Sequence, residues 1–405
     1  MATTQVRAPG RAVSGRIEAM AQILRDVGVS CELALPDGEV LRLGEAPPAF
    51  RVAFKSERAL RVPLTEFALG RAYVEGDLDF DGDMMALLDV RDRLRAGATP
   101  AQKLRFATQL FLRSPTWVNS RAIDNHYTLG DDFYLTFLDK RYRFYSHCLF
   151  QSDDETLEQA AEHKLESMWN ALGLRPGMRL LDIGGGWGGV TEYCGARGVH
   201  VTSLTLTEDS ANYIRNLIRE QRVPGEVIVE DVLEHRPSEP YDHAVIYGVI
   251  EHIPNYRRFC QRVWDALKPG GRLYLDASAA KEKFAISAFT RHYIWPGTHA
   301  FLALQDMIEE LLFHGFEIVR VRRETRDYEL TTRHWAERLD ACHENIAARW
   351  GEPLYRAFRL YLWGGSHGLK ANRLQGYHLV AERRPDPGPR PGNWRRFRHF
   401  LGSLR

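Results

Sequence analysis

The feature that most constrains the fold is a cluster of glycines that directly follows an apolar stretch. The segment LLDIGGGWGG spans residues 180–189, and a helical pattern comes after it. Glycines let the backbone turn sharply and approach a ligand closely, while the N-terminal amides of a helix attract negative charge. The glycines at 184, 186 and 189 also satisfy GxGxxG, which alone is a weak indication of a dinucleotide site.

Two features near this loop favour S-adenosylmethionine over NAD as its ligand. Asp182 lies two residues before the first glycine, where an acid can hold a ligand ammonium or order water beside a cationic cofactor. The next apolar run, HVTSLTL at 200–206, ends in threonines and lacks the acid that binds the ribose of NAD. We therefore expect S-adenosylmethionine, and a glycine-rich turn without a ligand is the competing interpretation.

The hydrophobic pattern changes along the chain and divides it into regions. From about residue 171, short apolar runs alternate with amphipathic helical segments, which predicts a doubly wound, mostly parallel sheet with helices on both faces. Earlier, CELALPDGEVLRLG at 31–44 predicts a hairpin with a two-residue turn at Asp37-Gly38. We expect a small α+β domain at 1–95, a helical connection at 96–119, an α/β Rossmann-like domain at 120–384 and a basic aromatic tail at 385–405.

Composition excludes several classes of protein. The net charge is +1, so nothing in the overall charge points to nucleic acid, and no nucleic-acid partner is expected. The five cysteines are an odd number without a CxxC pair, which favours a reducing cytoplasm and gives no zinc ribbon or other metal site. No apolar stretch approaches 18 residues, so any membrane contact is expected to be peripheral. GxxxxGK[ST], HExxH and GxSxG are all absent, so NTP hydrolysis, zincin and α/β-hydrolase chemistry lack their residues.

Further motifs carry a family resemblance over most of the chain. They are HYTLGDDFYLTFLD (126–139), YSHCLF (145–150), LRPGMRLLDIGGGWGG (174–189), LTLTEDS (204–210), VIEHI (249–253), ALKPGGRLYL (266–275) and DYELTTRHW (327–335). With these, the sequence resembles the cyclopropane fatty acid synthase family of S-adenosylmethionine-dependent methyltransferases, which modify double bonds in the acyl chains of lipids. The resemblance implies a class I methyltransferase domain. ALGRAYVEGDLD (68–79) also resembles the small, lipid-binding-like N-terminal domain of longer family members.

The resemblance implies where the cofactor binds. Tyr145 and Ser146 would hold the methionine moiety, although Tyr145 could equally be a core aromatic. The remaining implied cofactor-binding residues are Asp182, Gly184 and Gly186 around the amino acid and ribose, Thr205 at the end of the next strand, and Asp231 and Val232 around the adenine. Ser210 departs from the pattern, because the family commonly has a ribose-binding glutamine there.

In the resembling family the base is thought to be a bound bicarbonate, and this chain departs from the residues that hold it. Glu251 and Tyr328 match two of the four positions. The other two differ, since His147 stands at the cysteine position and Asp276 at the position of a strand-end histidine. The sequence thus leaves open whether bicarbonate is used.

The chemistry that the family performs explains why these positions matter. An isolated alkene is a poor nucleophile, so it must be held in line with the sulfonium methyl and kept from water. Methyl transfer leaves a carbocation, and a base must remove a proton from it. We predict that a protein carboxylate replaces bicarbonate, with Asp276 as first choice and Glu251 as base or as its hydrogen-bond partner. Neighbouring carboxylates, or His147 nearby, would raise the pKa of at least one of these carboxyl groups. Alternatively, Asp276 faces solvent or caps a loop, and His147 is a plain substitution.

We expect methyl transfer to the double bond of an unsaturated fatty acyl chain, within a phospholipid, giving a cyclopropane or a methyl- or methylene-branched chain. The alternatives are a methyltransferase for a soluble small molecule and a non-catalytic lipid- or cofactor-binding relative. The tail from Arg383 to Arg405 has seven arginines with interleaved aromatics, which favours a cytoplasmic enzyme bound peripherally to the inner membrane face, with a solvated tail as the alternative. A homodimer is compatible with the sequence.

Overall fold

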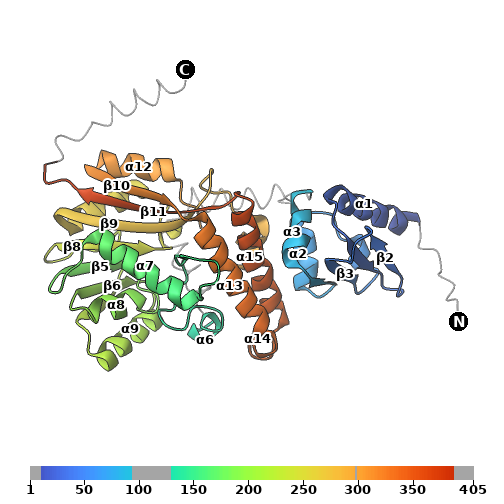
Figure 1. The fold of residues 1–405 in the computed structure, drawn as a ribbon, viewed down its shortest axis with the longest axis horizontal. Coiled ribbons are helices and arrows are strands. Elements are labelled where there is room, and N and C mark those ends of the chain that lie inside the picture. Colours follow the sequence, from blue (N-terminus) through green and yellow to red (C-terminus); the bar gives the residue numbers. More distant parts are fainter. Residues whose placement is uncertain (1–10, 94–128, 297–298, 387–405) are drawn as a thin grey trace, which may run out of the picture. The chain divides into compact units, whose positions relative to one another are not determined.

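The computed structural model describes residues 11–93, 129–296 and 299–386, which form two compact units (Figure 1). The first unit combines the N-terminal part of the chain with residues 286–297 and 335–367, and the second contains the rest. The expected domain at 120–384 thus contributes two segments to the first unit. The connection expected at 96–119, and all but two residues of the tail expected at 385–405, lie outside the described residues.

The first unit is built on a four-stranded sheet with the strand order β2-β1-β3-β4. Its elements are α1 (Arg11–Val27), β1 (Cys31–Ala34), β2 (Val40–Leu43), β3 (Phe50–Phe54), α2 (Glu66–Val74), β4 (Leu78–Gly82), α3 (Met84–Asp89), α11 (Ala288–Tyr293), α14 (His343–Trp350) and most of α15 (Glu352–Lys370). Short 3-10 turns lie at Ala59–Arg61 and Val90–Arg93. The α+β character expected for this region is confirmed.

The hairpin expected at 31–44 is present, but its turn differs from the expectation. Ala34 pairs with Val40 across antiparallel β1 and β2, so the connection has five residues rather than two. The Leu35 amide donates to the Glu39 carbonyl at 2.8 Å, and the Gly38 amide donates to the Leu35 carbonyl at 3.0 Å. The reason is Pro36, whose fixed φ suits the second position of an ordinary β-turn and leaves Gly38, with φ of +91°, to complete the loop.

The second unit contains a seven-stranded sheet with the order β10-β11-β9-β8-β5-β6-β7 (Figure 1). Its strands are β5 (Arg179–Ile183), β6 (His200–Thr205), β7 (Gly225–Val229), β8 (Tyr241–Tyr247), β9 (Leu267–Ala279), β10 (Phe316–Arg323) and β11 (Gln375–Arg383). Five neighbouring strands of the sheet, in the spatial order β9-β8-β5-β6-β7, run parallel to one another. Strand β11 runs antiparallel to both of its neighbours, β9 and β10. The expected mostly parallel, Rossmann-like sheet is confirmed.

Helices cover both faces of this sheet because successive strand residues point to opposite sides. The helices of this unit are α6 (Asp131–Tyr134), α7 (Leu157–Leu172), α8 (Gly189–Gly195), α9 (Glu208–Gln221), α10 (Tyr256–Ala266), α12 (Leu304–Phe313) and the first part of α13 (Thr325–Ala341), with a 3-10 turn at Ile250–His252. Residues 335–341 of α13 belong to the first unit. Leu181 and Ile183 of β5 pack in one apolar core with residues of α10 and α12. On the other face, Ser203 of β6 meets Thr191 of α8, with their hydroxyl oxygens 2.8 Å apart.

Helix α7 carries a side chain of the site and has well-defined ends. Thr156 and Gln159 form a capping box at its start, and Gly173 ends it in the left-handed conformation with φ of +67°. An N-cap of this kind stabilises a helix by about 1 kcal/mol. None of the described helices is both long and apolar enough to cross a membrane.

Candidate functional site

The loop after β5 has the sharp turns that its glycines suggested. Gly184, Gly186 and Gly188 have φ values of +83°, +53° and +76°, a region that other residues rarely adopt. A Cβ on Gly184 would lie 2.4 Å from Cγ2 of Val249. The amides of Gly184 and Gly185 both donate to the Leu204 carbonyl at 2.9 Å, which ties the loop to the end of β6. Only glycine fits at position 184.

Asp182 is buried at the end of β5, directly before this loop. Its Oδ2 accepts a hydrogen bond from the Ser203 hydroxyl at 3.0 Å. Burial raises the pKa of Asp182 to about 7, although the hydrogen bond from Ser203 acts in the opposite direction. A positively charged ligand nearby would favour the ionised form, so this carboxyl group can respond to a cationic cofactor near neutral pH.

The other residues expected at the cofactor lie at the same edge of the sheet. The Thr205 carbonyl at the end of β6 accepts from the Glu230 amide at 2.9 Å, which brings the segment after β7 alongside. In that segment the Asp231 carboxylate accepts from the Leu233 amide at 2.9 Å, and Val232 is buried. The parallel strands β5, β6, β7 and β8 all end here, and ligands of open α/β sheets bind at such an edge.

Tyr145 and Ser146 lie close to the end of β8. A Cβ on Gly248 would lie 3.0 Å from the Ser146 Cβ and 3.6 Å from the Tyr145 carbonyl oxygen. The Tyr145 ring packs against Tyr134 with a centroid distance of 5.3 Å, so it also forms part of an aromatic cluster. The expected cofactor residues therefore gather along one edge of the sheet, with both polar and aromatic groups suited to an adenosyl sulfonium.

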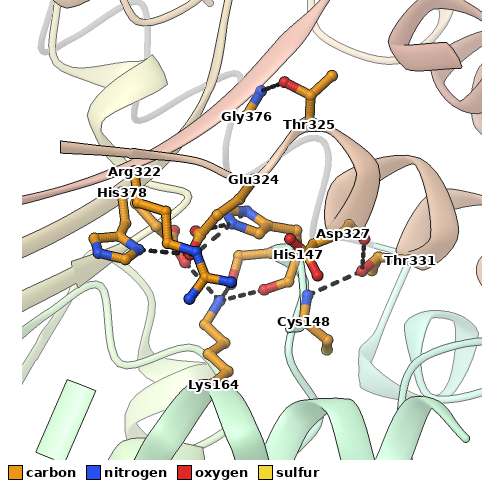
Figure 2. A network of polar contacts seen from close by, with 12 residues as sticks. His147, Cys148, Lys164, Arg322, Glu324, Thr325, Asp327, Thr331, Gly376 and His378 are labelled. Carbon is orange, nitrogen blue, oxygen red and sulfur yellow. Dashed lines mark hydrogen bonds and ion pairs between the residues drawn. The ribbon is translucent and has the colours of Figure 1, made fainter. Parts of the chain in front are cut away.

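Lys164, which Figure 2 labels, takes part in a buried ion pair beside Ser146. Lys164 Nζ of α7 is 2.7 Å from Asp276 Oδ2 of β9, and both side chains are at most 2% exposed. The same ammonium donates to the Ser146 hydroxyl at 2.6 Å and to the His147 carbonyl at 2.7 Å. The second carboxylate oxygen, Asp276 Oδ1, accepts from the Gly248 amide at 3.0 Å. The alternative that Asp276 faces solvent is wrong, whereas its hydrogen bond to Gly248 in the loop after β8 agrees with the alternative that it caps a loop. Both oxygens of the carboxylate are therefore engaged.

Glu324, between β10 and α13, holds two imidazoles (Figure 2). Its carboxylate oxygens lie 2.7 Å from His147 Nε2 and 2.5 Å from His378 Nδ1. Burial acts to raise the pKa of Glu324, but the hydrogen bonds from both histidines outweigh it and lower the pKa to about 2. His147 Nδ1 is 4.0 Å from Asp276 Oδ2, and the Tyr328 ring stacks on His147 with centroids 4.7 Å apart. His147, Asp276 and Tyr328 are thus brought together as expected from the sequence.

Glu251 completes this group from the turn after β8. Its Oε1 accepts from both the amide and the hydroxyl of Ser278, each at 2.8 Å. Its Oε2 is buried and has no hydrogen-bond partner among the described residues. Burial raises the pKa of Glu251 to about 7, and the charge of Asp276 adds a smaller contribution. One carboxyl pKa is raised as expected, but burial is the main cause rather than the neighbouring carboxylate.

Sequence reasoning missed three residues of this cluster, namely Lys164, Glu324 and His378. Lys164 carried a signal, because it stands in the apolar stripe of α7 among Ala160, Ala161 and Leu165. A charge in such a stripe indicates a buried partner. The described part of the chain contains no group of three or more His, Cys, Asp or Glu residues arranged to hold a metal ion.

Comparisons with known proteins agree with this geometry. The family model for mycolic acid cyclopropane synthetase matches residues 116–379. The chain is 27% identical over 374 residues to a probable fatty acid methyltransferase of Pseudomonas putida, covering 88% of this chain and 93% of that protein. It is 27% identical over 361 residues to the cyclopropane-fatty-acyl-phospholipid synthase of Escherichia coli, covering 86% and 91%. The solved mycolic acid cyclopropane synthase CmaA1, complexed with SAH and CTAB, is similar at 25% identity with a TM-score of 0.60, covering 65% of this chain and 98% of that one.

Proposed function

The chain belongs to the mycolic acid cyclopropane synthetase family of S-adenosylmethionine-dependent methyltransferases, and from this we propose that it methylates the double bond of an unsaturated fatty acyl chain in a phospholipid. Relatives that act on fatty acids and on fatty-acyl phospholipids support the substrate class. The observation that carries the proposal is the group of buried side chains Glu251, Asp276 and His147, with the Tyr328 ring stacked on His147. We propose that these residues form the base site beside the cofactor.

The residues at the edge of the sheet would bind and orient the cofactor, which supplies an electrophilic methyl group on a sulfonium. Asp182 would face its cationic portion, and the backbone of Gly184 and Gly186 would allow it to approach closely. Tyr145 and Ser146 would hold the methionine moiety, while Thr205, Asp231 and Val232 would frame the ribose and adenine. The position of these residues along one edge of the sheet supports the proposed roles.

A protein group rather than bicarbonate is proposed to accept the proton. Two of the family's four base-site positions are changed, to His147 and Asp276. Both changed residues have a charged partner within the chain: Asp276 pairs with Lys164, and His147 pairs with Glu324. Proton loss from the new methyl group closes a cyclopropane directly. After a 1,2-hydride shift has moved the cation to the methylated carbon, loss from the methyl group gives a methylene branch, and loss from a chain carbon gives a methyl-branched alkene. A saturated methyl branch would need a separate reductant.

The test uses the full chain with vesicles of monounsaturated phospholipid and methyl-deuterated S-adenosylmethionine, followed by mass spectrometry of the released fatty acids. Addition of CD2 indicates a ring or a methylene, and ozonolysis separates these because only the methylene is an alkene. Addition of CD3 indicates a methyl-branched alkene. Vesicles of saturated phospholipid serve as the control and should give no product. Measurable cofactor binding without any incorporation would refute the proposed substrate and favour a soluble acceptor or a non-catalytic relative.

We also propose that the enzyme binds the cytoplasmic face of the membrane peripherally, because the proposed substrate is embedded in a bilayer. The arginine-rich, aromatic tail would add electrostatic attraction to anionic lipids. Co-sedimentation with anionic vesicles should then weaken as salt is raised. Equal binding to neutral and to anionic vesicles would contradict the proposed electrostatic attraction between the tail and anionic lipids.

A further inference from the structure

The Glu324 carboxylate determines which nitrogen of each neighbouring imidazole carries a proton. With its pKa lowered to about 2, Glu324 is ionised at neutral pH and can only accept hydrogen bonds. His147 must therefore donate from Nε2, and His378 must donate from Nδ1. The opposite nitrogens, His147 Nδ1 and His378 Nε2, then carry lone pairs. Both nitrogens are buried without a hydrogen-bond partner among the described residues, so each can accept a proton when its ring is neutral.

The charges of the cluster favour the addition of one proton. Lys164 neutralises Asp276 in a fully buried pair. In the part of the chain that the structure describes, Glu324 has no comparable buried cation, because Arg322 approaches it only to 3.9 Å and the Arg322 side chain is 53% exposed. A carboxylate that is buried beside two neutral imidazoles is incompletely compensated, and a positive charge on one imidazole would complete the compensation.

Position distinguishes His147 from His378 as the proton acceptor. His147 directly follows Tyr145 and Ser146, and its Nδ1 lies 4.0 Å from Asp276 Oδ2, so an imidazolium there would have a carboxylate near each nitrogen. His378 pairs with Asp276 across the sheet through the backbone, but its ring stacks on Tyr274, with centroids 4.9 Å apart, and in the described residues its ion pair is with Glu324 alone. The second carboxylate makes His147 the better site for the added charge.

We propose that His147 is the proton acceptor of the methyl-transfer reaction and that Glu324 is the positioning residue that fixes its tautomer and stabilises the imidazolium. This inference rests on the proposed function. In the step, the methyl–sulfur bond breaks as a bond forms from the methyl carbon to one alkene carbon, leaving a cation on the other. A C–H bond then breaks, its electron pair closes the ring or forms a new double bond, and the proton moves to His147 Nδ1. No further reactant is needed.

Several charged or titratable groups face His147 and would affect its protonation. Three elements and one connection supply them: Asp276 on β9, Lys164 on α7, Asp327 and Tyr328 on α13, and Glu324 between β10 and α13. In the described residues, Glu324 is the group among them that makes a hydrogen bond to a ring nitrogen of His147, at 2.7 Å. Its replacement should therefore affect the imidazole most directly.

The activity test compares His147→Gln and Glu324→Gln with the wild-type chain on monounsaturated phospholipid vesicles. Loss of a general base lowers kcat by about 100-fold or more, so His147→Gln should lose this much while its Kd for S-adenosylmethionine stays within about twofold. Glu324→Gln should lower kcat and move the acid limb of the plot of kcat against pH to lower pH. The reason is that the His147 imidazolium loses the carboxylate that pairs with it. Glu329→Gln is the matched control: Glu329 is a buried carboxylate on α13 that pairs with Arg333 instead, and this variant should change neither quantity.

A second readout separates this inference from the proposed function. Nitrogen NMR of the full chain with labelled histidine should show His147 protonated at Nε2, assigned by its loss in His147→Gln, and Glu324→Gln should perturb that signal. Wild-type turnover that persists in His147→Gln, or that is lost only in Glu251→Gln, would overturn the inference and leave the proposed function intact. Absence of turnover on every unsaturated lipid would refute the proposed function. The NMR result does not depend on turnover: a proton on His147 Nδ1 instead of Nε2 would overturn the role of Glu324.

Discussion

Replacement of Lys164 by methionine should strongly destabilise the second unit. Methionine fills much of the same volume but removes the ammonium, which contacts Asp276 at 2.7 Å, the Ser146 hydroxyl at 2.6 Å and the His147 carbonyl at 2.7 Å. Asp276 would keep only the hydrogen bond from the Gly248 amide. Removing one partner of a buried ion pair costs about 3–5 kcal/mol, because the other charge stays buried without compensation.

The effect can be measured by urea unfolding followed by tryptophan fluorescence. A chain with two compact units can unfold in two steps, so the relevant step is the one that S-adenosylmethionine shifts to higher urea. Combining Lys164→Met with Asp276→Asn should restore at least about 1.5 kcal/mol relative to the sum of the single effects, since the two residues are in direct contact. The control is Arg215→Met, which breaks an exposed pair with Glu208 at 3.0 Å and should cost less than about 1 kcal/mol. A loss below about 1 kcal/mol for Lys164→Met, or strict additivity in the double variant, would refute the reasoning.

Three further predictions concern single groups. Because the folded-state pKa of Glu251 is about 7 and its ordinary value is 4.5, the folded state binds that proton more tightly, and the unfolding free energy should fall as pH rises through this window. Glu251→Gln should therefore be more stable than the wild type at pH 8, by about 1–3 kcal/mol, and equal to it near pH 4, as measured by urea unfolding; a constant difference would contradict this. Calorimetry in two buffers should show proton release when S-adenosylmethionine binds at pH 6 but not at pH 8, and Asp182→Asn should abolish the release, since the pKa of Asp182 is about 7. Gly184→Ala should weaken cofactor binding at least about tenfold because its Cβ would meet Val249 at 2.4 Å, whereas Gly177→Ala, with a similar φ of +85° and nothing within 4 Å, should bind normally.

The fold of the second unit could be predicted because its signals are local. The apolar run before Gly184 predicts β5, and the glycines that follow require backbone angles that the structure confirms. The turn at 35–39 was mispredicted because the Asp37-Gly38 pair was given more weight than Pro36, which already fixes the second position of a turn. The assignment of residues 286–297 and 335–367 to the first unit could not be read from the sequence, since it depends on contacts between segments far apart in the chain.

The motif residues of the site could be predicted, but their partners could not. Glu324 is separated from His147 by 177 positions and from His378 by 54, so no spacing in the sequence relates them. Each of the missed residues comes from a different element, and only the packing of β9, β10, β11 and α7 brings them together. The role of Asp276 likewise depended on Lys164, because an unpaired Asp276 would be a candidate base whereas both oxygens of the observed carboxylate already have partners.

The two departures from the family's base site make sense as one arrangement. A cysteine at position 147 would leave Glu324 with His378 as its only imidazole donor, and a histidine at position 276 would leave the Lys164 ammonium without its carboxylate. Instead, His147 gives Glu324 a second imidazole donor, and Asp276 gives the Lys164 ammonium a carboxylate. The Nδ1 atom of His147 and the Oδ2 atom of Asp276 are 4.0 Å apart. Moving the imidazole from the strand to the loop therefore keeps a basic nitrogen in the cluster while Lys164 and Glu324 both remain paired. The basic group that bicarbonate is thought to supply elsewhere in the family can thus be part of this chain itself.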